Sequence, residues 1–520
     1  MAIELSKLTF TDENNIVPVS GVEKIFNTGF TNTLAGDDTI NGDTGNNFSI
    51  PENRVSGFYN TGTLYTADGN DIISGRGNSI TNTGNSFSGI YSSGTINTAD
   101  GDDTINGIRH RSNSFNDFGY GIYIENGIIN TEDGNDLITG LTKARVGEGI
   151  AIEFGGGIHT GNGNDTITGG GNEGINVHFF GSIDTGRGND IITGNGGRGL
   201  RNSYIITTGD DHDQIIADGI GYGIYNLGAI DTGDGNDIIS STSTSPGSSA
   251  LSNRPGSRIA SINTGNGDDI ITGNGGDYGI TNTSQSSSIE TGEGNDTITG
   301  IGLAYGIFNQ ASITTGSGND LIIAQGGFIN SGIVFLGSGD DSIIADANLS
   351  GNGLLNSFNI IIDTGDGNDV ITSTGAIYNE GVINTGNGDD SIIVDGGIDG
   401  TDTKYGIYNN HGRINTGDGN DTIIANGGFD PGGWDNAGLV FLGSGEDYLK
   451  GFGSGGFDGG KGQDKLELTS GGYTVGISGT TVNFIKGINI MATVDFEILI
   501  AGKATYNILK LIDGQTIIVT

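Results

Sequence analysis

A six-residue turn that ends in aspartate recurs along the chain, and its residue types suit the binding of a hard cation. In TGNGDD, residues 264 to 269, two glycines permit backbone angles that other residues avoid, so the turn can direct several carbonyl oxygens at one point. The final aspartate, Asp269, adds a carboxylate. Calcium takes about six to eight oxygen ligands, mixes carboxylate with backbone carbonyl and tolerates irregular geometry. One turn offers too few ligands, so we expect two stacked turns to share each ion.

The turn occurs sixteen times, and Asp464 ends a candidate seventeenth copy. Successive final aspartates are separated by between 21 residues (Asp320 to Asp341) and 33 residues (Asp38 to Asp71), a period typical of solenoids and repeat arrays. The predicted metal ligands are Asp38, Asp71, Asp103, Asp136, Asp165, Asp190, Asp213, Asp237, Asp269, Asp296, Asp320, Asp341, Asp369, Asp390, Asp421, Asp447 and Asp464.

The electrostatics of stacked copies also favour a divalent cation. Like charges about 5 Å apart along one edge would repel one another at a cost on the order of several tenths to a few kcal/mol per neighbouring pair. A cation between them makes the net electrostatic energy attractive. The alternative is a tight turn whose aspartate only caps backbone N–H groups. Because the turn recurs in register in a chain with few lysine partners for its carboxylates, we favour calcium.

Two other known motifs do not fit the sequence. An EF-hand is excluded because its terminal glutamate and flanking helices are missing. A P-loop is excluded because GGFDGGK, residues 455 to 461, is followed by Gly462 where that motif needs Ser or Thr.

The segments around the turn predict strands. Residues 223 to 240, GIYNLGAIDTGDGNDIIS, contain three short runs with strand-like patterns, separated by turn residues, and no run has helical spacing. Coils of three parallel strands cannot bury their own apolar face, but stacking them builds a continuous core. We therefore predict an all-β fold, a right-handed parallel β-helix (solenoid) of about sixteen coils with a small β-rich C-terminal cap.

An asparagine often stands eleven residues before the final aspartate. We expect these asparagines to form a buried hydrogen-bonded ladder at one corner of the coils, with an aromatic residue before several of them (Tyr59, Tyr225, Phe308, Tyr378, Tyr408) packing in or beside the core. The constant spacing predicts that every insertion falls between an aspartate and the next asparagine. The asparagines are Asn27, Asn60, Asn202, Asn226, Asn309, Asn330, Asn379 and Asn436.

The overall charge restricts the class of partner. The chain has 62 acidic and 21 basic residues and a net charge of −41, which argues against nucleic acids and anionic membranes, because both need clustered Lys and Arg. Without cysteine it can form neither disulfides nor thiolate metal sites. No apolar run has the length of a membrane span, and the N-terminal stretch lacks the features of a signal peptide. We expect calcium ions as the main partner, with cell-surface polysaccharide or other proteins as further candidates.

The turn and the strand after it resemble the RTX nonapeptide, G-G-x-G-x-D-x-U-x, of calcium-binding β-rolls and β-helices. Gly265, Gly267, Asp269 and Ile271 match this pattern, Thr264 replaces the first glycine, and GGKGQDKLE, residues 459 to 467, fits better still. The resemblance implies calcium between adjacent turns, with carboxylate and turn carbonyls as ligands. It also implies an extracellular or cell-surface location reached by type I secretion, and folding after export.

The resemblance extends from about residue 33 to residue 467, with one nonapeptide per long coil, so we expect a single calcium row. Residues 1–26 are predicted as an N-terminal cap, 27–450 as the solenoid, and 451–520 as an RTX-like turn followed by a cap, a secretion signal or both. Departures from the pattern at Leu34, Ala67, Ala99 and Asp211 make the sites of the first three coils and of Asp213 the weakest.

These patterns suggest three functional hypotheses. The leading hypothesis is a secreted or cell-surface calcium-binding structural protein without enzymatic activity. The second is a polysaccharide lyase or epimerase on a β-helix, which needs a base and cations in one groove. A cluster of His, Arg and acid shared by neighbouring coils would favour this second hypothesis. The five histidines are scattered over different coils and are expected at the surface or in loops, and Arg109, His110 and Arg111 are expected to form a solvated cluster. The histidines are His110, His159, His178, His212 and His411.

The third hypothesis is an ice-binding solenoid, which needs a flat outward ladder of Thr and Asx. The central turn residue varies too much for this, but the threonine before the first glycine forms a row that keeps the hypothesis open. Members of this row include Thr160, Thr185, Thr232, Thr264 and Thr291.

Overall fold

The computed structural model describes residues 2–18, 23–45, 55–77, 87–110, 118–256, 258–347, 351–396, 398–399, 402–403, 405–429 and 438–520. The chain divides into two compact units, Met1–Gly276 and Asp277–Thr520. Among the described residues, helical structure is limited to two 3-10 turns, η1 (Leu5–Lys7) and η2 (Ile508–Lys510), and no helix has the length and apolar character needed to cross a membrane.

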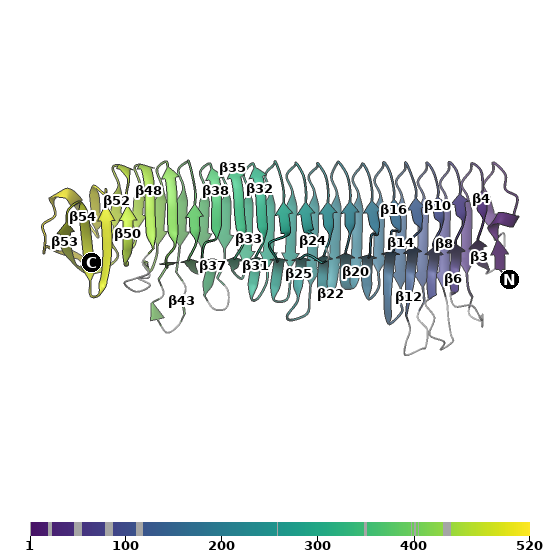
Figure 1. The fold of residues 1–520 in the computed structure, drawn as a ribbon, viewed down its shortest axis with the longest axis horizontal. Coiled ribbons are helices and arrows are strands. Elements are labelled where there is room, and N and C mark those ends of the chain that lie inside the picture. Colours follow the sequence, from purple (N-terminus) through teal and green to yellow (C-terminus); the bar gives the residue numbers. More distant parts are fainter. Residues whose placement is uncertain are drawn as a thin grey trace. The chain divides into compact units, whose positions relative to one another are not determined.

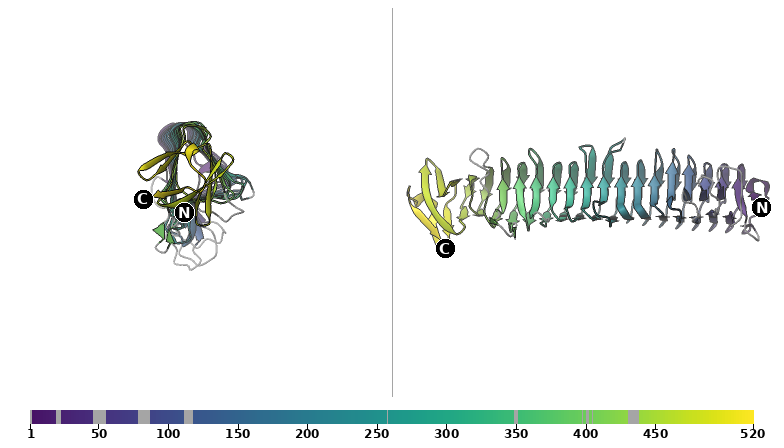
Figure 2. Two further views of the ribbon diagram at one scale, coloured as in Figure 1. Left: turned by 90° about the vertical axis from the view of Figure 1, so that its left-hand side faces the viewer. Right: turned by 90° about the horizontal axis from the view of Figure 1, so that it is seen from below.

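Each coil contributes one strand to each of three parallel rows (Figures 1 and 2). The first-row strand follows the turn aspartate, the second-row strand follows a loop, and the third-row strand leads into the next turn. Between coils the pairing is in register, so that Ile138 lies beside Ile167 in the first row and Ile158 beside Ile183 in the third. The predicted parallel β-helix with three strands per coil is confirmed.

In the first unit, two long strands run through both the first and the second row. The first row contains β2 (Ile16–Val17), β5 (Thr39–Asp43), β8 (Ile72–Gly77), β11 (Thr104–Arg109), β14 (Leu137–Thr142), β17 (Thr166–Gly170), β20 (Ile191–Asn202), β22 (Gln214–Asn226), β24 (Ile238–Ser243) and β27 (Ile270–Asn274). The second row contains β1 (Ala2–Glu4), β3 (Lys24–Asn27), β6 (Val55–Asn60), β9 (Phe87–Ser92), β12 (Phe118–Glu125), β15 (Val146–Glu153), β18 (Glu173–Val177), the ends of β20 and β22, and β25 (Ser249–Asn253). The third row contains β4 (Phe30–Asn32), β7 (Thr63–Tyr65), β10 (Thr95–Asn97), β13 (Ile128–Asn130), β16 (Gly157–His159), β19 (Ser182–Asp184), β21 (Ile205–Thr207), β23 (Ala229–Asp231) and β26 (Ala260–Asn263).

The second unit repeats this arrangement. Its first row contains β30 (Thr297–Ile301), β33 (Leu321–Gln325), β36 (Ser342–Ala345), β39 (Val370–Ser373), β42 (Ser391–Val394), β47 (Thr422–Ala425), β49 (Tyr448–Lys450), β52 (Lys465–Glu467) and β56 (Ile498–Ala501). Its second row contains β28 (Tyr278–Asn282), β31 (Tyr305–Asn309), β34 (Phe328–Asn330), β37 (Asn352–Asn356), β40 (Ala376–Asn379) and β45 (Ile407–Asn409). Its third row contains β29 (Ser287–Glu290), β32 (Ser312–Ser317), β35 (Ile333–Ser338), β38 (Ile361–Asp366), β41 (Val382–Asn384), β46 (Arg413–Asp418), β48 (Leu439–Gly445), β50 (Gly455–Asp458) and β55 (Asn489–Val494).

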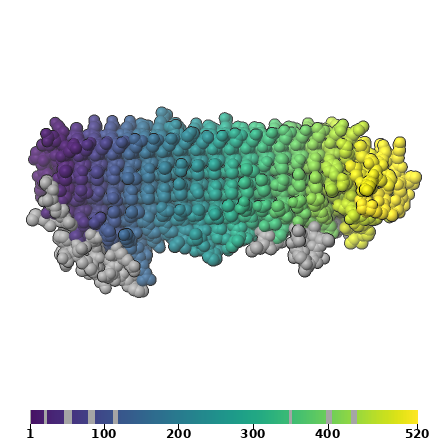
Figure 3. Space-filling model, turned by 180° about the vertical axis from the view of Figure 1, so that it is seen from behind, coloured from purple at the N-terminus to yellow at the C-terminus, as the bar shows by residue number. Residues whose placement is uncertain are grey.

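The core consists of apolar side chains stacked one per strand and coil. Ile138, Ile150 and Ile158 come from the three strands of one coil, and none of them has exposed surface. Because side chains alternate between the faces of a strand, each strand points one aliphatic residue inward and its neighbours outward. Equivalent side chains therefore form continuous rows in the core of each unit. They also form rows on the surface (Figure 3).

The predicted asparagine ladder is confirmed at one corner of the coils. The Nδ2 group of Asn202 donates to Oδ1 of Asn226 at 3.0 Å, and that of Asn309 donates to Oδ1 of Asn330 at 2.9 Å. Asn436 lies outside the described residues. The aromatic residues before the ladder are half-buried and flank the core, as in the stacked pair of Tyr378 and Tyr408.

The predicted constant spacing is wrong. Asn253 continues the ladder of the first unit, since Asn226 donates to it at 2.9 Å, and Asn282 begins the ladder of the second unit, since it donates to Asn309 at 3.0 Å. They stand sixteen residues before Asp269 and fourteen before Asp296, so insertions also enter between asparagine and turn. The loop after β25, of which the structure describes residues 254–256 and 258–259, is such an insertion.

The ends of the chain extend the stacking. Strand β1 already pairs in parallel with β3, within the segment predicted as a cap, and β52 pairs in parallel with β56 beyond residue 450. The predicted C-terminal cap consists of antiparallel strands, with β53 (Gly471–Ser478) between β54 (Thr481–Lys486) and β58 (Thr516–Val519), and β57 (Ala504–Asn507) beside β56. Two short pieces, β43 (Ile398–Asp399) and β44 (Asp402–Thr403), form a hairpin, and β51 (Lys461–Gly462) pairs with β48.

Candidate metal centre

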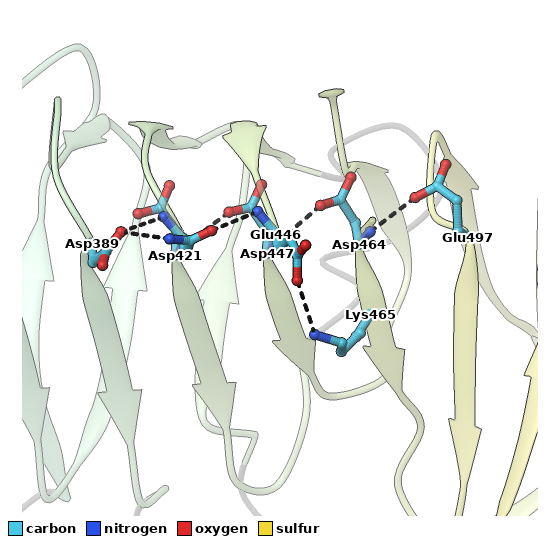
Figure 4. Close-up of polar contacts among 8 residues, drawn as sticks. Asp389, Asp421, Glu446, Asp447, Asp464, Lys465 and Glu497 are labelled. Atoms are coloured by element: carbon cyan, nitrogen blue, oxygen red, sulfur yellow. Dashed lines mark hydrogen bonds and ion pairs between the residues drawn. The ribbon is translucent and has the colours of Figure 1, made fainter. Parts of the chain in front are cut away.

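In each unit the predicted aspartates form one line of side chains, which we call the aspartate row. Within each unit, successive row aspartates are linked, because the backbone N–H of one donates to Oδ1 of the aspartate one coil further on, as between Asp165 and Asp190 at 2.8 Å. Figure 4 shows this pattern in the second unit, where Asp447 donates to Asp464 at 2.9 Å and Asp464 donates to Glu497 at 2.9 Å. Asp464 therefore belongs to the row, and Glu497 takes the position after it.

The second carboxylate oxygen of the row has no such donor. Each row aspartate is at most 2% exposed, and Oδ2 has no hydrogen-bond partner among the described residues in fifteen of them. A buried carboxylate oxygen without a partner is costly, because it has left water and gained nothing in return. The row therefore needs either protons or a cation. The fifteen are Asp38, Asp71, Asp103, Asp136, Asp165, Asp190, Asp213, Asp237, Asp320, Asp341, Asp369, Asp390, Asp421, Asp447 and Asp464.

The pKa values of the row aspartates also indicate that the bare row is unfavourable. Burial, with a smaller contribution from neighbouring row aspartates, raises the pKa of Asp103 and of Asp190 to about 8. Burial likewise raises the pKa of Asp71 to about 7 and that of Asp237 to about 6. Threonine hydroxyls beside the row lower these pKa values, but burial outweighs them. Near neutral pH the row without a cation is thus held partly protonated.

The turn glycines are required by close contact as well as by backbone angle. Gly267 has φ of +139°, and a Cβ built on it would lie 1.7 Å from the carbonyl oxygen of Gly235 in the preceding coil. A Cβ on Gly265, where φ is +82°, would lie 1.8 Å from the carbonyl oxygen of Gly233. Turn carbonyl oxygens therefore lie directly against the backbone of the turn one coil further on, and a side chain on these glycines would collide with them.

The coils expected to be weakest keep the geometry of the others. Leu34, Ala67 and Ala99 stand where later turns have glycine, yet they adopt φ values between 60° and 67°, and Asp211 adopts 90°. The row hydrogen bonds continue through these coils, with Asp38 donating to Asp71 at 2.7 Å. The non-glycine residues keep the shape of the turn at the cost of backbone strain.

The threonine row is buried and cannot form an ice-binding face. Thr160 and Thr185 have no exposed surface, and their hydroxyls donate to the carbonyl oxygen of the next threonine in the row, at 3.1 Å and 3.2 Å. These threonines therefore tie one coil to the next. The hypothesis that they contact ice is wrong.

A second ladder, on the exposed side of the turn, was not predicted. In most of the described coils, the residue before the row aspartate accepts the N–H of its equivalent in the following coil, as Asn164 accepts from Asn189 at 2.7 Å and Asn189 from His212 at 2.9 Å. Its bonds run in the opposite direction to those of the aspartate row. The recurrence of Asn and Asp at this position was the available signal.

The histidine and arginine predictions hold only in part. Arg109 has no exposed surface, so the expected solvated cluster is wrong for this residue, and Arg111 lies outside the described residues. His178 is in a loop as expected, but it is half-buried and lies near two acids. Among the described residues, Glu148, Glu173 and His178 form the one group of three whose ligand atoms all lie within 4.8 Å of one another. Arg198 and Arg201 of the next coil contact Glu173 and His178, so a cluster of His, Arg and acid shared by neighbouring coils is present, which is the arrangement that favours the lyase or epimerase hypothesis.

The raised pKa values predict that the metal-free protein is stabilised by acid. The folded pKa of these carboxylates, about 6 to 8, lies above their unfolded pKa near 3.8. Their contribution to folding stability is therefore fully present below the unfolded pKa and is lost as pH rises through the folded pKa. We expect the midpoint of thermal unfolding in EDTA to rise as pH falls from about 8 to about 5.5. With calcium the trend reverses, because protons compete for the ligands. A metal-free midpoint that falls with acid would contradict this account.

No protein-family model and no curated protein matches the chain. It is similar to a solved structure described as a hyperactive, Ca2+-dependent, beta-helical antifreeze protein from an Antarctic bacterium. The two chains are 16% identical, the match covers 81% of this chain and 82% of that one, and the TM-score is 0.27.

Proposed function

We propose that this protein is a calcium-binding structural protein in which ions lie between successive turns of the aspartate row. The observation that carries the proposal is the line of buried Oδ2 atoms, fifteen of which have no hydrogen-bond donor among the described residues. Such a line is costly as bare carboxylates, and calcium prefers the carboxylate and carbonyl oxygens that the turns offer. Bound calcium supplies the positive charge that the row lacks. The row itself holds one oxygen of each carboxylate in place through the N–H of the preceding coil.

The proposal includes a location outside the cell and a role in shape rather than catalysis. The resemblance to RTX repeats supports type I secretion, and binding sites of extracellular modules work at calcium concentrations of about 10⁻⁴ to 10⁻³ M. Calcium then acts as a folding signal, because the row is disfavoured where the ion is scarce. Magnesium suits the row less well, since it demands near-ideal octahedral geometry and gives up water reluctantly.

A substitution of one row aspartate tests the proposal. Asp237→Asn keeps an Oδ1 acceptor for the N–H of Asp213, which now donates to Oδ1 of Asp237 at 2.8 Å, but removes the charge. With saturating calcium we expect the variant to lose about 3 kcal/mol of unfolding free energy, through the ions on either side. In EDTA at about pH 8 we expect it to gain about 1 kcal/mol, because a buried carboxylate of raised pKa is gone.

The matched control is Asp234→Asn. Asp234 lies in the same turn, is exposed and accepts a hydrogen bond from Asn266. It carries the same charge change, and we expect less than about 0.5 kcal/mol in either condition. Urea unfolding of the three proteins, together with calcium counting after equilibrium dialysis, measures both effects. If Asp237→Asn destabilised the protein equally with and without calcium, the turn would be a structural corner and the proposal would fail.

A further inference from the structure

A pocket on the first unit stands apart from the aspartate row. It has a volume of about 240 Å³ and is lined by His178, Phe179, Phe180, Arg201, Tyr204 and Arg258, among others. These residues come from β20, from the corners between second-row and third-row strands, and from the inserted loop after β25. That loop is one of the unpredicted insertions between asparagine and turn, and it places Arg258 over the ring of Tyr204, with the guanidinium carbon 4.5 Å from the ring centroid.

The pocket is positively charged, although the chain as a whole has a net charge of −41. Among the described residues, no ion pair is made by Arg201 or Arg258, whereas Arg198 beside them pairs with Glu173 at 2.7 Å. Arg201 instead lies 3.2 Å from the ring nitrogens of His178. Two guanidinium groups without a carboxylate partner, close to one opening, favour an anionic ligand.

The acids near the pocket do not cancel this charge. Burial, followed by the charges of Glu173 and Glu153, raises the pKa of Glu148 to about 8 even though Asn176 and the charge of Arg201 lower it, so Glu148 is largely neutral near pH 7. Burial and Arg201 lower the pKa of His178 to about 4, so its ring is neutral as well. Glu148, Glu173 and His178 have the spacing of metal ligands, but Arg198 and Arg201 contact two of them. A second cation would therefore meet two positive side chains there.

The rim of the pocket is aromatic. Phe154, Phe179 and Phe180 are between 56% and 63% exposed, with Phe154 and Phe179 stacked at 6.3 Å and Phe180 edge-on to Tyr204 at 5.5 Å. Exposed aromatic rings gathered at one place on a soluble protein mark an interaction site more often than chance. Flat rings pack against the C–H face of a sugar, whose hydroxyl groups then reach polar donors at the edge. Ser203 supplies such a group, since its hydroxyl is buried and makes no hydrogen bond to the described residues.

We propose that this pocket binds one acidic sugar unit, a uronate, of a polysaccharide chain. Arg201 and Arg258 take the carboxylate, and Tyr204 and Phe180 pack against the ring. A second pocket of about 490 Å³ adjoins it and shares Tyr204 and Arg258, which gives room for a neighbouring unit of the chain. The exposed rings of Phe154 and Phe179 extend the contact surface toward the neighbouring coil, where the next sugar of the chain would lie. An acidic peptide would use the arginines but would leave the aromatic rim without a matching flat face.

The test uses the full-length protein with calcium and a glucuronate-containing tetrasaccharide, in comparison with the same tetrasaccharide after reduction of its carboxylates to alcohols. Isothermal titration is expected to show at least tenfold tighter binding of the acidic form, and saturation-transfer NMR to show contact with aromatic protons. We expect Arg258→Gln to weaken the binding at least tenfold. Arg258 is exposed, so the variant is expected to keep the circular dichroism and calcium binding of the parent.

Arg187→Gln is the matched control, because Arg187 is exposed in the same unit and does not line the pocket. It should leave sugar binding within twofold of the parent. Equal binding of the acidic and reduced tetrasaccharides, or binding insensitive to Arg258→Gln, would overturn the proposal. Binding of a glutamate-rich hexapeptide as tight as that of the acidic sugar would show a general anion site and overturn the sugar assignment. Since calcium binding is measured on the same samples, a failure of the calcium proposal is distinguishable from a failure of this one.

Discussion

Removal of calcium with EDTA at about pH 8 is expected to lower the midpoint of thermal unfolding by more than about 20 °C. Each ion present at about one hundred times its Kd contributes roughly 2.7 kcal/mol, and the row has room for many ions. Typical domains have only about 5 to 15 kcal/mol of stability in total. The loss of only a few sites therefore approaches the whole stability of a unit, and the cost of burying the bare carboxylates is added to it.

Far-UV circular dichroism during heating measures this effect. Calcium added back from micromolar to millimolar concentration should restore the β signal cooperatively, because each ion joins two coils. Magnesium at the same concentrations is the control and should restore little of it. A β signal and a midpoint that are the same in EDTA and in calcium would contradict the account and would leave the turns as structural corners.

Gly267→Ala is expected to have the second-largest effect, a loss of about 4 kcal/mol or more in the presence of calcium. The substituted residue would keep a φ of +139°, which an L-residue rarely adopts, and its Cβ would lie 1.7 Å from the carbonyl oxygen of Gly235. Backbone on both sides must move apart to admit it, which breaks the spacing of two stacked turns. Urea unfolding with calcium measures the loss.

Gly247→Ala separates the two causes. Gly247 also has a positive φ, +78°, but a Cβ on it would meet nothing within 4 Å. We expect a cost of about 1 kcal/mol from the backbone angle alone. If both variants lost the same amount, close contact between turns would not be what requires glycine.

The repeat made most of the fold predictable. One isoleucine per strand, three strands per coil and a turn at a regular interval are sufficient to predict stacked parallel coils, and the core of Ile138, Ile150 and Ile158 follows from that pattern. The stacking of the predicted aspartates in a row within each unit also follows, because the same position in each copy must stack on its equivalent.

Other features depend on the orientation of side chains and the position of insertions, which residue types do not specify. The threonine hydroxyls could point outward or inward, and only the path of the backbone turns Thr160 toward the carbonyl oxygen of Thr185. The pocket depends on irregular segments, since Arg258 reaches Tyr204 from an insertion of unpredicted position. Arg109 shows the same limit, because a charged residue next to His110 and Arg111 has the pattern of a solvated loop and is nevertheless buried.

The most direct test of calcium in the aspartate row is the anomalous diffraction of crystals grown with calcium. We expect a line of anomalous peaks along the row, one between each pair of successive aspartates such as Asp165 and Asp190, within calcium–oxygen distance of about 2.3 to 2.6 Å from Oδ2. Ordered crystals with no anomalous density along the row, or with calcium only on exposed surface acids, would contradict the account.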